Sequence, residues 1–261
     1  MNKSNNNSKK NINQKLNSDW YPNNKKITNK KSDLYFADAC DTSRNISLTK
    51  KSLQKVKTID KDGFLPLSGS EPHYNPKKWN DDIDDRYNHN CYAYFLDDLI
   101  HNRPKRPQPG HVDPNMSIFK KQDYTREEIT RRAIYDNPSI YCTDPEATCE
   151  KGYYKGALVI DRYNNYHWLL QNSNGYWSHK PGQLPVTNTD ADKKPIKDPR
   201  KANLLYDNSD KGYTLFYSDI GPFFCVPNTK ETGIKKRSST CDQCGGGIRR
   251  NNTSGTCYKC K

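Results

Sequence analysis

The sequence predicts an α+β fold, in which an early buried helix packs on a later antiparallel sheet. Helical patterns come first, at residues 88–101 and again from residue 125 to about 135. Strand patterns separated by turn residues follow from residue 156 onward, and helices followed by a run of strands are typical of α+β domains. Paired cysteines after residue 240 add a small separate unit near the C-terminal end.

Residues 88–101 open the helical part of the chain. Their apolar side chains cover nearly all faces of a helix, which predicts burial rather than an amphipathic surface position. The proline-rich stretch 102–110 ends this helix. A second helix is expected to begin at Thr125, because Thr125 and Glu128 have the spacing of a capping box.

Short apolar runs predict the sheet. We expect its strands at residues 156–161, 166–173, 176–180, 213–217 and 223–226. An Asn-Gly turn at residues 174–175 joins the second and third strands into a hairpin. The polar, proline-containing segment 182–211 is expected to form a long ordered loop.

Four of the nine cysteines form the pattern Cys241-x2-Cys244-x12-Cys257-x2-Cys260. Four thiolates at this spacing suit a tetrahedral Zn²⁺ ion in a closed, structural site. We therefore expect a zinc ribbon that binds a partner or recruits substrate.

Composition divides the rest of the chain. Residues 1–31 contain ten Asn, eight Lys and one acidic residue, and such a segment buries too little apolar surface to offset its ordering entropy. The expected units are a disordered Asn/Lys-rich leader at 1–31, a lead-in without an assigned fold at 32–71, the main domain at 72–227, a basic linker at 228–240 and the ribbon at 241–261.

The net charge of +13 lies in the two ends of the chain. Residues 1–31 carry a net charge of +7, residues 228–261 carry +6, and the segment between them has as many acidic as basic residues. Basic ends favour polyanions, so weak nucleic-acid contact through the termini is expected. No apolar run is long enough for a transmembrane helix, and no membrane partner is expected.

The cysteine usage predicts a reducing compartment, since the total is odd and no secretory signal is recognisable. The two Cys-x2-Cys pairs near the C-terminal end, called knuckles below, also suit Zn²⁺ binding rather than disulfides. The expected location is the cytoplasm, including a virion or host cytoplasm, because the Asn/Lys-rich composition resembles that of large DNA viruses. Cys142 and Cys149 are accordingly predicted to be two free thiols on a surface loop.

A cysteine and a histidine about 75 residues apart predict the chemistry. Cys91 opens the buried helix, where free backbone amides favour a thiolate, and His167 lies on a later strand. Brought together, they make a nucleophile with its own base.

The hairpin register decides whether His179 assists His167. With a two-residue loop, His179 would lie opposite Leu170, on the face away from His167. With a three-residue loop at 173–175, His179 would lie opposite Leu169 and share the face of His167. We predict the three-residue loop.

If His179 is not the residue that orients His167, the alternatives are Ser178, Asn188 and Asp190.

These segments resemble papain-like cysteine hydrolases of the NlpC type over roughly residues 72–226. In that family a cysteine begins a buried helix, a histidine begins a later strand, and a polar third residue, often histidine, lies on the next strand. The resemblance implies that Cys91 is the nucleophile, His167 the base and His179 the orienting residue.

The resemblance also implies an oxyanion hole at the backbone amide of Cys91, helped by Tyr74, Tyr87 or Asn90. The family usually has Asp-Cys-Ser-Gly at the nucleophile, whereas this chain has Asn90-Cys91-Tyr92-Ala93.

The expected function is that of a thiol hydrolase or acyl transferase acting on an amide or peptide bond of a protein or peptide substrate. The alternative is a non-catalytic zinc-ribbon binding or structural protein on the same scaffold, associated with a virion or with nucleic acid.

Overall fold

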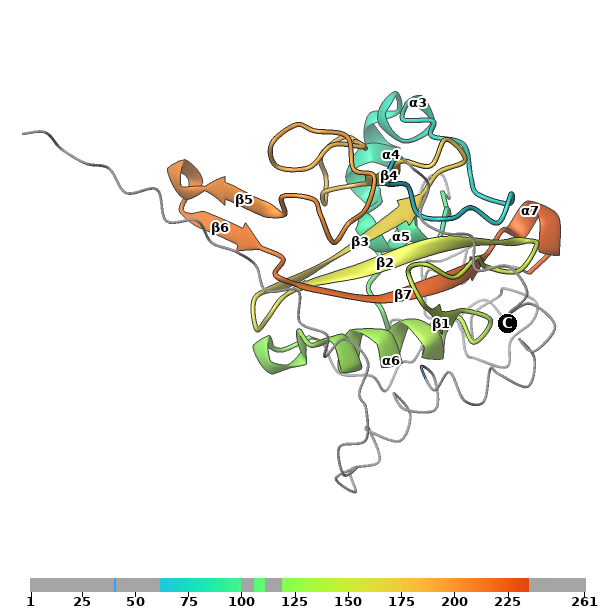
Figure 1. Cartoon of the computed structure of the whole chain (residues 1–261). Coiled ribbons are helices and arrows are strands. Elements are labelled where there is room, and N and C mark those ends of the chain that lie inside the picture. The colour runs from blue at the N-terminus through green and yellow to red at the C-terminus, as the bar shows by residue number, and fades with distance from the viewer. Residues whose placement is uncertain (1–39, 41–61, 100–105, 111–118, 235–261) are drawn as a thin grey trace, which may run out of the picture.

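The structure is a computed structural model that describes residues 40, 62–99, 106–110 and 119–234. A five-stranded antiparallel sheet forms its centre, with the strand order β1-β7-β2-β3-β4 (Figure 1). Its strands are β1 (Tyr141–Thr143), β2 (Tyr153–Asp161), β3 (Asn165–Gln171), β4 (Trp177–His179) and β7 (Asp219–Pro227). A separate two-stranded hairpin consists of β5 (Leu205–Asn208) and β6 (Tyr213–Phe216). The architecture confirms the predicted α+β class with an antiparallel sheet.

The helices are short, apart from one. They are α3 (Lys77–Asn80), α4 (Ile83–Asn88), α5 (Cys91–Phe95), α6 (Arg126–Asp136) and α7 (Thr229–Thr232), with single 3₁₀ turns η1 (Lys121–Asp123) and η2 (Ser209–Lys211). Helix α6 begins where the capping pattern predicts, because the side chain of Thr125 accepts a hydrogen bond from the backbone amide of Glu128.

The helix that carries Cys91 is much shorter than the predicted 88–101. Asn90 is extended, and its side chain accepts a hydrogen bond from the amide of Ala93 at 3.2 Å, so α5 starts at Cys91. Asp97 has a left-handed backbone with φ 45°, which ends the helix after one turn and a half. Cys91 is nevertheless the first helical residue, as the sequence predicts.

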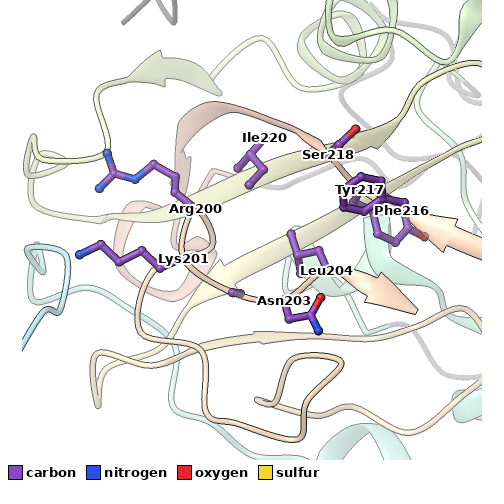
Figure 2. A pocket seen from close by; sticks show the side chains of 9 residues that line it. Arg200, Lys201, Asn203, Leu204, Phe216, Tyr217, Ser218 and Ile220 are labelled. Carbon is purple, nitrogen blue, oxygen red and sulfur yellow. The ribbon is translucent and has the colours of Figure 1, made fainter. Parts of the chain in front are cut away.

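One face of the sheet is covered by segments without helices. Residues of the 182–211 loop and of the β5–β6 hairpin pack there on Ala157, Val159 and Leu169. Between the loop and β6 they leave a pocket of about 270 Å³, lined among others by Lys201 and Tyr217 (Figure 2).

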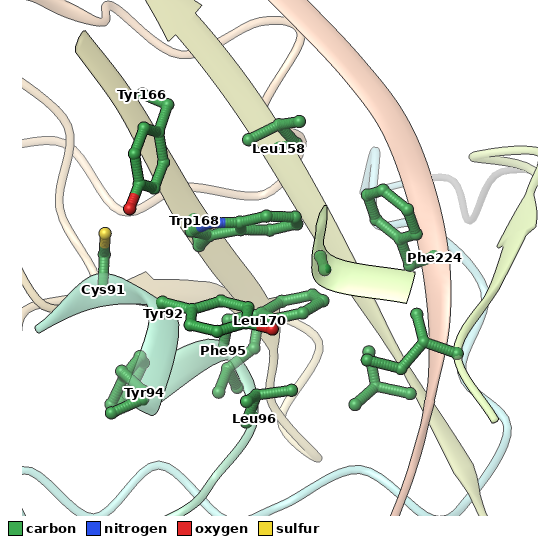
Figure 3. Close-up of a cluster of buried hydrophobic side chains, with 14 of the residues drawn as sticks. Cys91, Tyr92, Tyr94, Phe95, Leu96, Leu158, Tyr166, Trp168, Leu170 and Phe224 are labelled. Atoms are coloured by element: carbon green, nitrogen blue, oxygen red, sulfur yellow. The ribbon is translucent and has the colours of Figure 1, made fainter. Parts of the chain in front are cut away.

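The opposite face of the sheet packs against α5 and α6. Strand β3 sends Tyr166, Trp168 and Leu170 into this core, and they meet the aromatic side chains of α5 (Figure 3). Alternation along a strand then places the neighbours of these residues, His167 among them, on the loop-covered face. The side chains of β3 therefore divide between two separate cores.

Gly156 of β2 allows α5 to lie close to the sheet. A Cβ atom at this position would lie only 2.2 Å from the ring of Phe95. Phe95 in turn lies on Trp168, with ring centroids 4.3 Å apart. This packing fixes the position of the short helix and of the cysteine at its start.

Two disulfides correct the prediction for the cysteines. Cys142 pairs with Cys40 and Cys149 pairs with Cys225, so neither Cys142 nor Cys149 is a free thiol. Their partners are 102 and 76 residues away in the chain, which spacing alone cannot reveal. Disulfides persist in oxidising environments, and the predicted reducing location in the cytoplasm or a virion is therefore wrong.

Candidate Cys-His-His site

The hairpin of β3 and β4 has the predicted register. His179 lies opposite Leu169, and the amide of Asn172 donates to the carbonyl of Tyr176 at 2.8 Å, which closes a three-residue loop. His167 and His179 therefore share one face of the sheet. The prediction that the longer loop brings the two histidines together is confirmed.

A chain of hydrogen bonds fixes the tautomers of the two rings. Nε2 of His179 lies 3.0 Å from the carbonyl of Thr189, and its Nδ1 lies 2.9 Å from Nε2 of His167. A carbonyl can only accept, so a neutral His179 carries its proton on Nε2 and accepts at Nδ1. His167 must then donate from Nε2, which leaves a lone pair on its Nδ1.

Burial keeps both rings neutral. The residues are 6% and 1% exposed, and desolvation lowers the pKa of His167 well below its usual value, with a further decrease from His179. Desolvation also lowers the pKa of His179, although the carbonyl of Thr189 and the charge of Asp190 act in the opposite direction. A neutral His167 with a free Nδ1 lone pair is the form that can accept a proton.

Cys91 is the one free thiol among the described residues, and it is 7% exposed. Desolvation raises the pKa of its thiol to about 12, while the backbone amides of Trp168 and Tyr92 and the charge of Lys180 act to lower it. The resting residue is therefore a protonated thiol. A base must remove its proton during an attack.

Cys91 and His167 approach the same stretch of β3 from its two sides. The backbone amide of Trp168, the residue after His167, lies near enough to the sulfur to lower the pKa of the thiol. Strand β4 ends at His179, opposite Leu169, so it does not cover the edge of β3 at this point.

The packing of the two residues differs. Cys91 belongs to the helix-facing core, whereas the ring of His167 lies against Tyr217 of the other core at 5.6 Å between centroids. Within the described residues, no hydrogen bond joins the sulfur to either ring. The structure thus brings the two histidines into direct contact, whereas the thiol of Cys91 lies in the core on the other face of the sheet.

The three residues expected to support an oxyanion have other contacts. Asn90 caps α5 and donates to the carbonyl of Pro107 at 2.5 Å. Tyr87 is 44% exposed, and Tyr74 is partly buried beside the backbone of Asn188.

The alternative orienting residues also have other contacts. The hydroxyl of Ser178 lies 2.6 Å from that of Tyr94 and donates to Asn172, on the helix-facing side. The carboxylate of Asp190 accepts backbone amides of its own loop, including that of Asn203 at 3.0 Å. The carbonyl of Thr189 is the group that contacts His179.

The structure adds a residue that the sequence did not identify as part of the site. Tyr166 precedes His167 on β3, and its hydroxyl and the sulfur of Cys91 point toward one another (Figure 3). Its hydroxyl donates to the side-chain carbonyl of Gln108, and burial raises its pKa well above the usual value, so the proton stays on the oxygen. Strand alternation beside a candidate histidine is the signal that would have identified it.

The four cysteines of the predicted zinc ribbon, at 241, 244, 257 and 260, lie outside the described residues. In the part of the chain that the structure describes, no three His, Cys, Asp or Glu side chains are grouped to hold a metal ion. None of the helices described there combines the length and the apolar character needed to cross a bilayer.

Comparisons with known proteins give one relative. No family model matches the chain, and no solved structure matches it significantly. The chain is 30% identical over 131 residues to insoluble matrix shell protein 1 of Ruditapes philippinarum. The match covers 50% of this chain and 80% of the relative. Since the aligned region spans most of that protein, the chain belongs to the family of insoluble matrix shell protein 1.

Proposed function

We propose that the chain is a thiol hydrolase or acyl transferase on a papain-like scaffold, acting on an amide or peptide bond. The observation that carries the proposal is the hydrogen-bond chain from Thr189 through His179 to His167. It leaves Nδ1 of His167 as the only ring nitrogen of the pair with a free lone pair. The thiol of Cys91, on α5, lies near the backbone of Trp168, the next residue of the strand that carries His167.

The reaction follows from these protonation states. As the sulfur of Cys91 attacks the carbonyl carbon, its proton passes to Nδ1 of His167, and His179 stabilises the cation that forms. The negative charge on the carbonyl oxygen is stabilised by the backbone amide of Cys91. His167 then returns its proton to the departing amine, and a thioester remains. Water or a second amine releases the acyl group from the sulfur.

Labelling with an electrophilic peptide, such as a peptidyl vinyl sulfone, tests the proposal at pH 7. A buried thiol with a raised pKa should react slowly unless a base assists it. We expect Cys91 in the folded protein to react faster than in the urea-unfolded chain. His167→Ala should lower the rate about 100-fold, the usual contribution of a general base.

Peptide mapping separates Cys91 from the other cysteines, and Cys91→Ser is the blank. Slower labelling of Cys91 in the folded than in the unfolded chain would disprove the proposal.

A structural role is the second candidate, and the comparison favours it. The relative is named for an insoluble shell matrix. The two disulfides of this chain suit a secreted protein, which is consistent with a role of that kind. In this case Cys91 would be an inert core thiol. The labelling experiment distinguishes the two functions, because an inert Cys91 would not be labelled faster in the folded protein than in the unfolded chain.

We also propose that the four C-terminal cysteines hold one structural Zn²⁺ ion. Their spacing supports this, as does the glycine run 245–247 after the first knuckle. Metal analysis of the purified full chain should give one zinc per molecule, and Cys241→Ser/Cys244→Ser should abolish it. An equal zinc content in both proteins would contradict the proposal.

A further inference from the structure

The hairpin of β5 and β6 is a separate part of the fold that lies beside the histidine pair. Within the described residues, its two strands pair with each other and with no strand of the central sheet. It projects beyond the end of that sheet (Figure 1). A two-stranded hairpin is only marginally stable by itself, so its position depends on the side chains that hold it against the body.

The two faces of the hairpin differ in burial. The register pairs Tyr206 with Leu215 and Leu205 with Phe216, and successive side chains of a strand point to opposite faces. Tyr206 and Leu215 pack on the core of the loop-covered face. Leu205 and Phe216 are 44% and 45% exposed. The first pair, called the inner pair below, therefore holds the hairpin against the body, whereas the second, outer pair faces solvent.

The inner side of the hairpin completes a circuit of four rings with the two histidines. The ring centroid of Tyr206 lies 6.4 Å from that of His179 and 6.2 Å from that of Tyr217, the residue after β6. Tyr217 in turn lies 5.6 Å from His167. Tyr206 thus contacts one histidine directly and the other through Tyr217. The hairpin and the residue after it therefore form part of the cover over both imidazoles.

This cover is held weakly. The hydroxyl of Tyr206 is buried and has no hydrogen-bond partner among the described residues, so closing the hairpin removes its hydration with no bond in return. The amide of Phe216 donates to the carboxylate of Asp161 at 3.1 Å, but this bond is exposed and water can replace it. A segment held by few buried contacts opens at a lower free energy than the core.

The base of the hairpin is also loosely packed. The pocket of about 270 Å³ lies there, and Leu204, Phe216, Tyr217 and Ser218 form part of its lining (Figure 2). These residues come from both arms of the hairpin at the point where the arms join the body. Space at this point allows the arms to move without displacing a close-packed side chain.

We propose that residues 205–217 form a flap that closes over His167 and His179 and opens without unfolding the five-stranded sheet. Its role rests on the proposed function, because the flap would control access to the base of that reaction. With the flap closed, the ring of His167 is buried against Tyr217. Opening uncovers the free Nδ1 lone pair of His167 and lets the hydroxyl of Tyr206 bond to water or to a carbonyl of a peptide substrate.

Diethyl pyrocarbonate tests the flap without involving the thiol. It transfers an ethoxycarbonyl group to a neutral imidazole nitrogen, so its rate at a buried histidine reports how often that ring is uncovered. Peptide mapping gives the rate at each histidine, and each rate is divided by that in the urea-unfolded chain. We expect the parent to react at least about 20-fold more slowly at His167 than at the exposed His73.

Two double substitutions on opposite faces of the hairpin identify the contacts that keep it closed. Tyr206→Ala/Leu215→Ala removes the inner pair and should raise the rate at His167 about tenfold, because the burial that favours closure is lost. Leu205→Ala/Phe216→Ala removes the outer pair from the same strands. Because that pair is exposed, the rate at His167 should stay within about twofold of the parent.

His89 reports whether a variant has unfolded as a whole. It is 1% exposed and packs on Trp79, away from the hairpin, so it should stay unreactive in both double variants. If the inner double variant also exposes His89, the single substitutions Leu215→Ala and Leu205→Ala are compared in its place, and the first should still give the faster reaction at His167.

Equal rates at His167 in the inner and outer variants would overturn the flap. So would a parent in which His167 reacts as fast as His73. The proposed function fails separately, because it is decided by the labelling of Cys91. An unactivated thiol would disprove the enzyme, whereas the histidine rates would still decide whether the hairpin opens.

Discussion

The rings of His167 and His179 meet edge to face, at 89° and with centroids 5.0 Å apart, twelve residues apart in the chain. This contact depends on one extra residue in the hairpin loop, because a two-residue loop would turn His179 to the other face. A buried ring that accepts from one histidine and donates to a carbonyl is a rigid orienting group. Its effect on His167 can be measured.

Replacing His179 should impair the site without unfolding it. His179→Ala removes the acceptor for Nε2 of His167, so the ring can rotate or change tautomer. We expect the labelling rate of Cys91 by a peptidyl vinyl sulfone to fall about 100-fold. His73→Ala is the matched control, because His73 is exposed and bonds only to Ser173 at the tip of the same hairpin. Equal rates in the two variants would contradict an orienting role for His179.

Stability should decrease as the pH falls below about 6.5, the ordinary pKa of histidine. His167 and His179 have lowered pKa values in the folded protein, so the unfolded chain binds protons first. Their contribution is full above pH 6.5 and is lost on acidification, at up to about 1.4 kcal/mol per pH unit for each ring. Urea unfolding between pH 7.5 and 5 measures the slope. The slope should be smaller in His167→Gln/His179→Gln than in His73→Gln.

Gly156→Ala should displace α5. The new methyl group would overlap the ring of Phe95, and overpacking of this kind costs about 1–3 kcal/mol. Urea unfolding should show the loss, and folding should no longer accelerate the labelling of Cys91. Gly156→Ala/Phe95→Leu should recover part of the stability, because the smaller side chain makes room. If the Gly156→Ala protein were as stable as the parent, the close packing of α5 on the sheet would not be required.

The disulfide between Cys149 and Cys225 should stabilise the fold strongly. It closes 76 residues, which corresponds to about 4 kcal/mol in the chain-entropy estimate. Cys149→Ala/Cys225→Ala should lose most of this stability under non-reducing conditions. In dithiothreitol the parent and the double variant should be about equally stable, because neither then has a disulfide. Intact mass without reductant gives an independent check, since the parent should lack four hydrogens relative to its reduced form.

Local patterns predicted the parts of the fold that local interactions determine. The β3–β4 hairpin, the start of α6 and the position of Cys91 at a helix start all depend on turn and capping residues within a few positions. The length of α5 was overestimated. Its apolar side chains are buried although the helix is short, and nothing in their pattern indicates that Asp97 has a left-handed backbone that ends the helix.

Features that depend on distant partners could not be predicted. Both disulfides join segments with no local signal for pairing, and the reducing compartment was inferred wrongly as a result. Strand β5 was assigned to a loop because only its pairing with β6 orders it.

The bond between Cys40 and Cys142 has a practical consequence for handling the protein. A protease that cuts anywhere between residues 41 and 61 would release no fragment, because the piece that contains Cys40 stays attached to β1. A nicked preparation would run as one band on a denaturing gel until a reductant is added. Gels should therefore be run with and without reductant before the chain is judged intact.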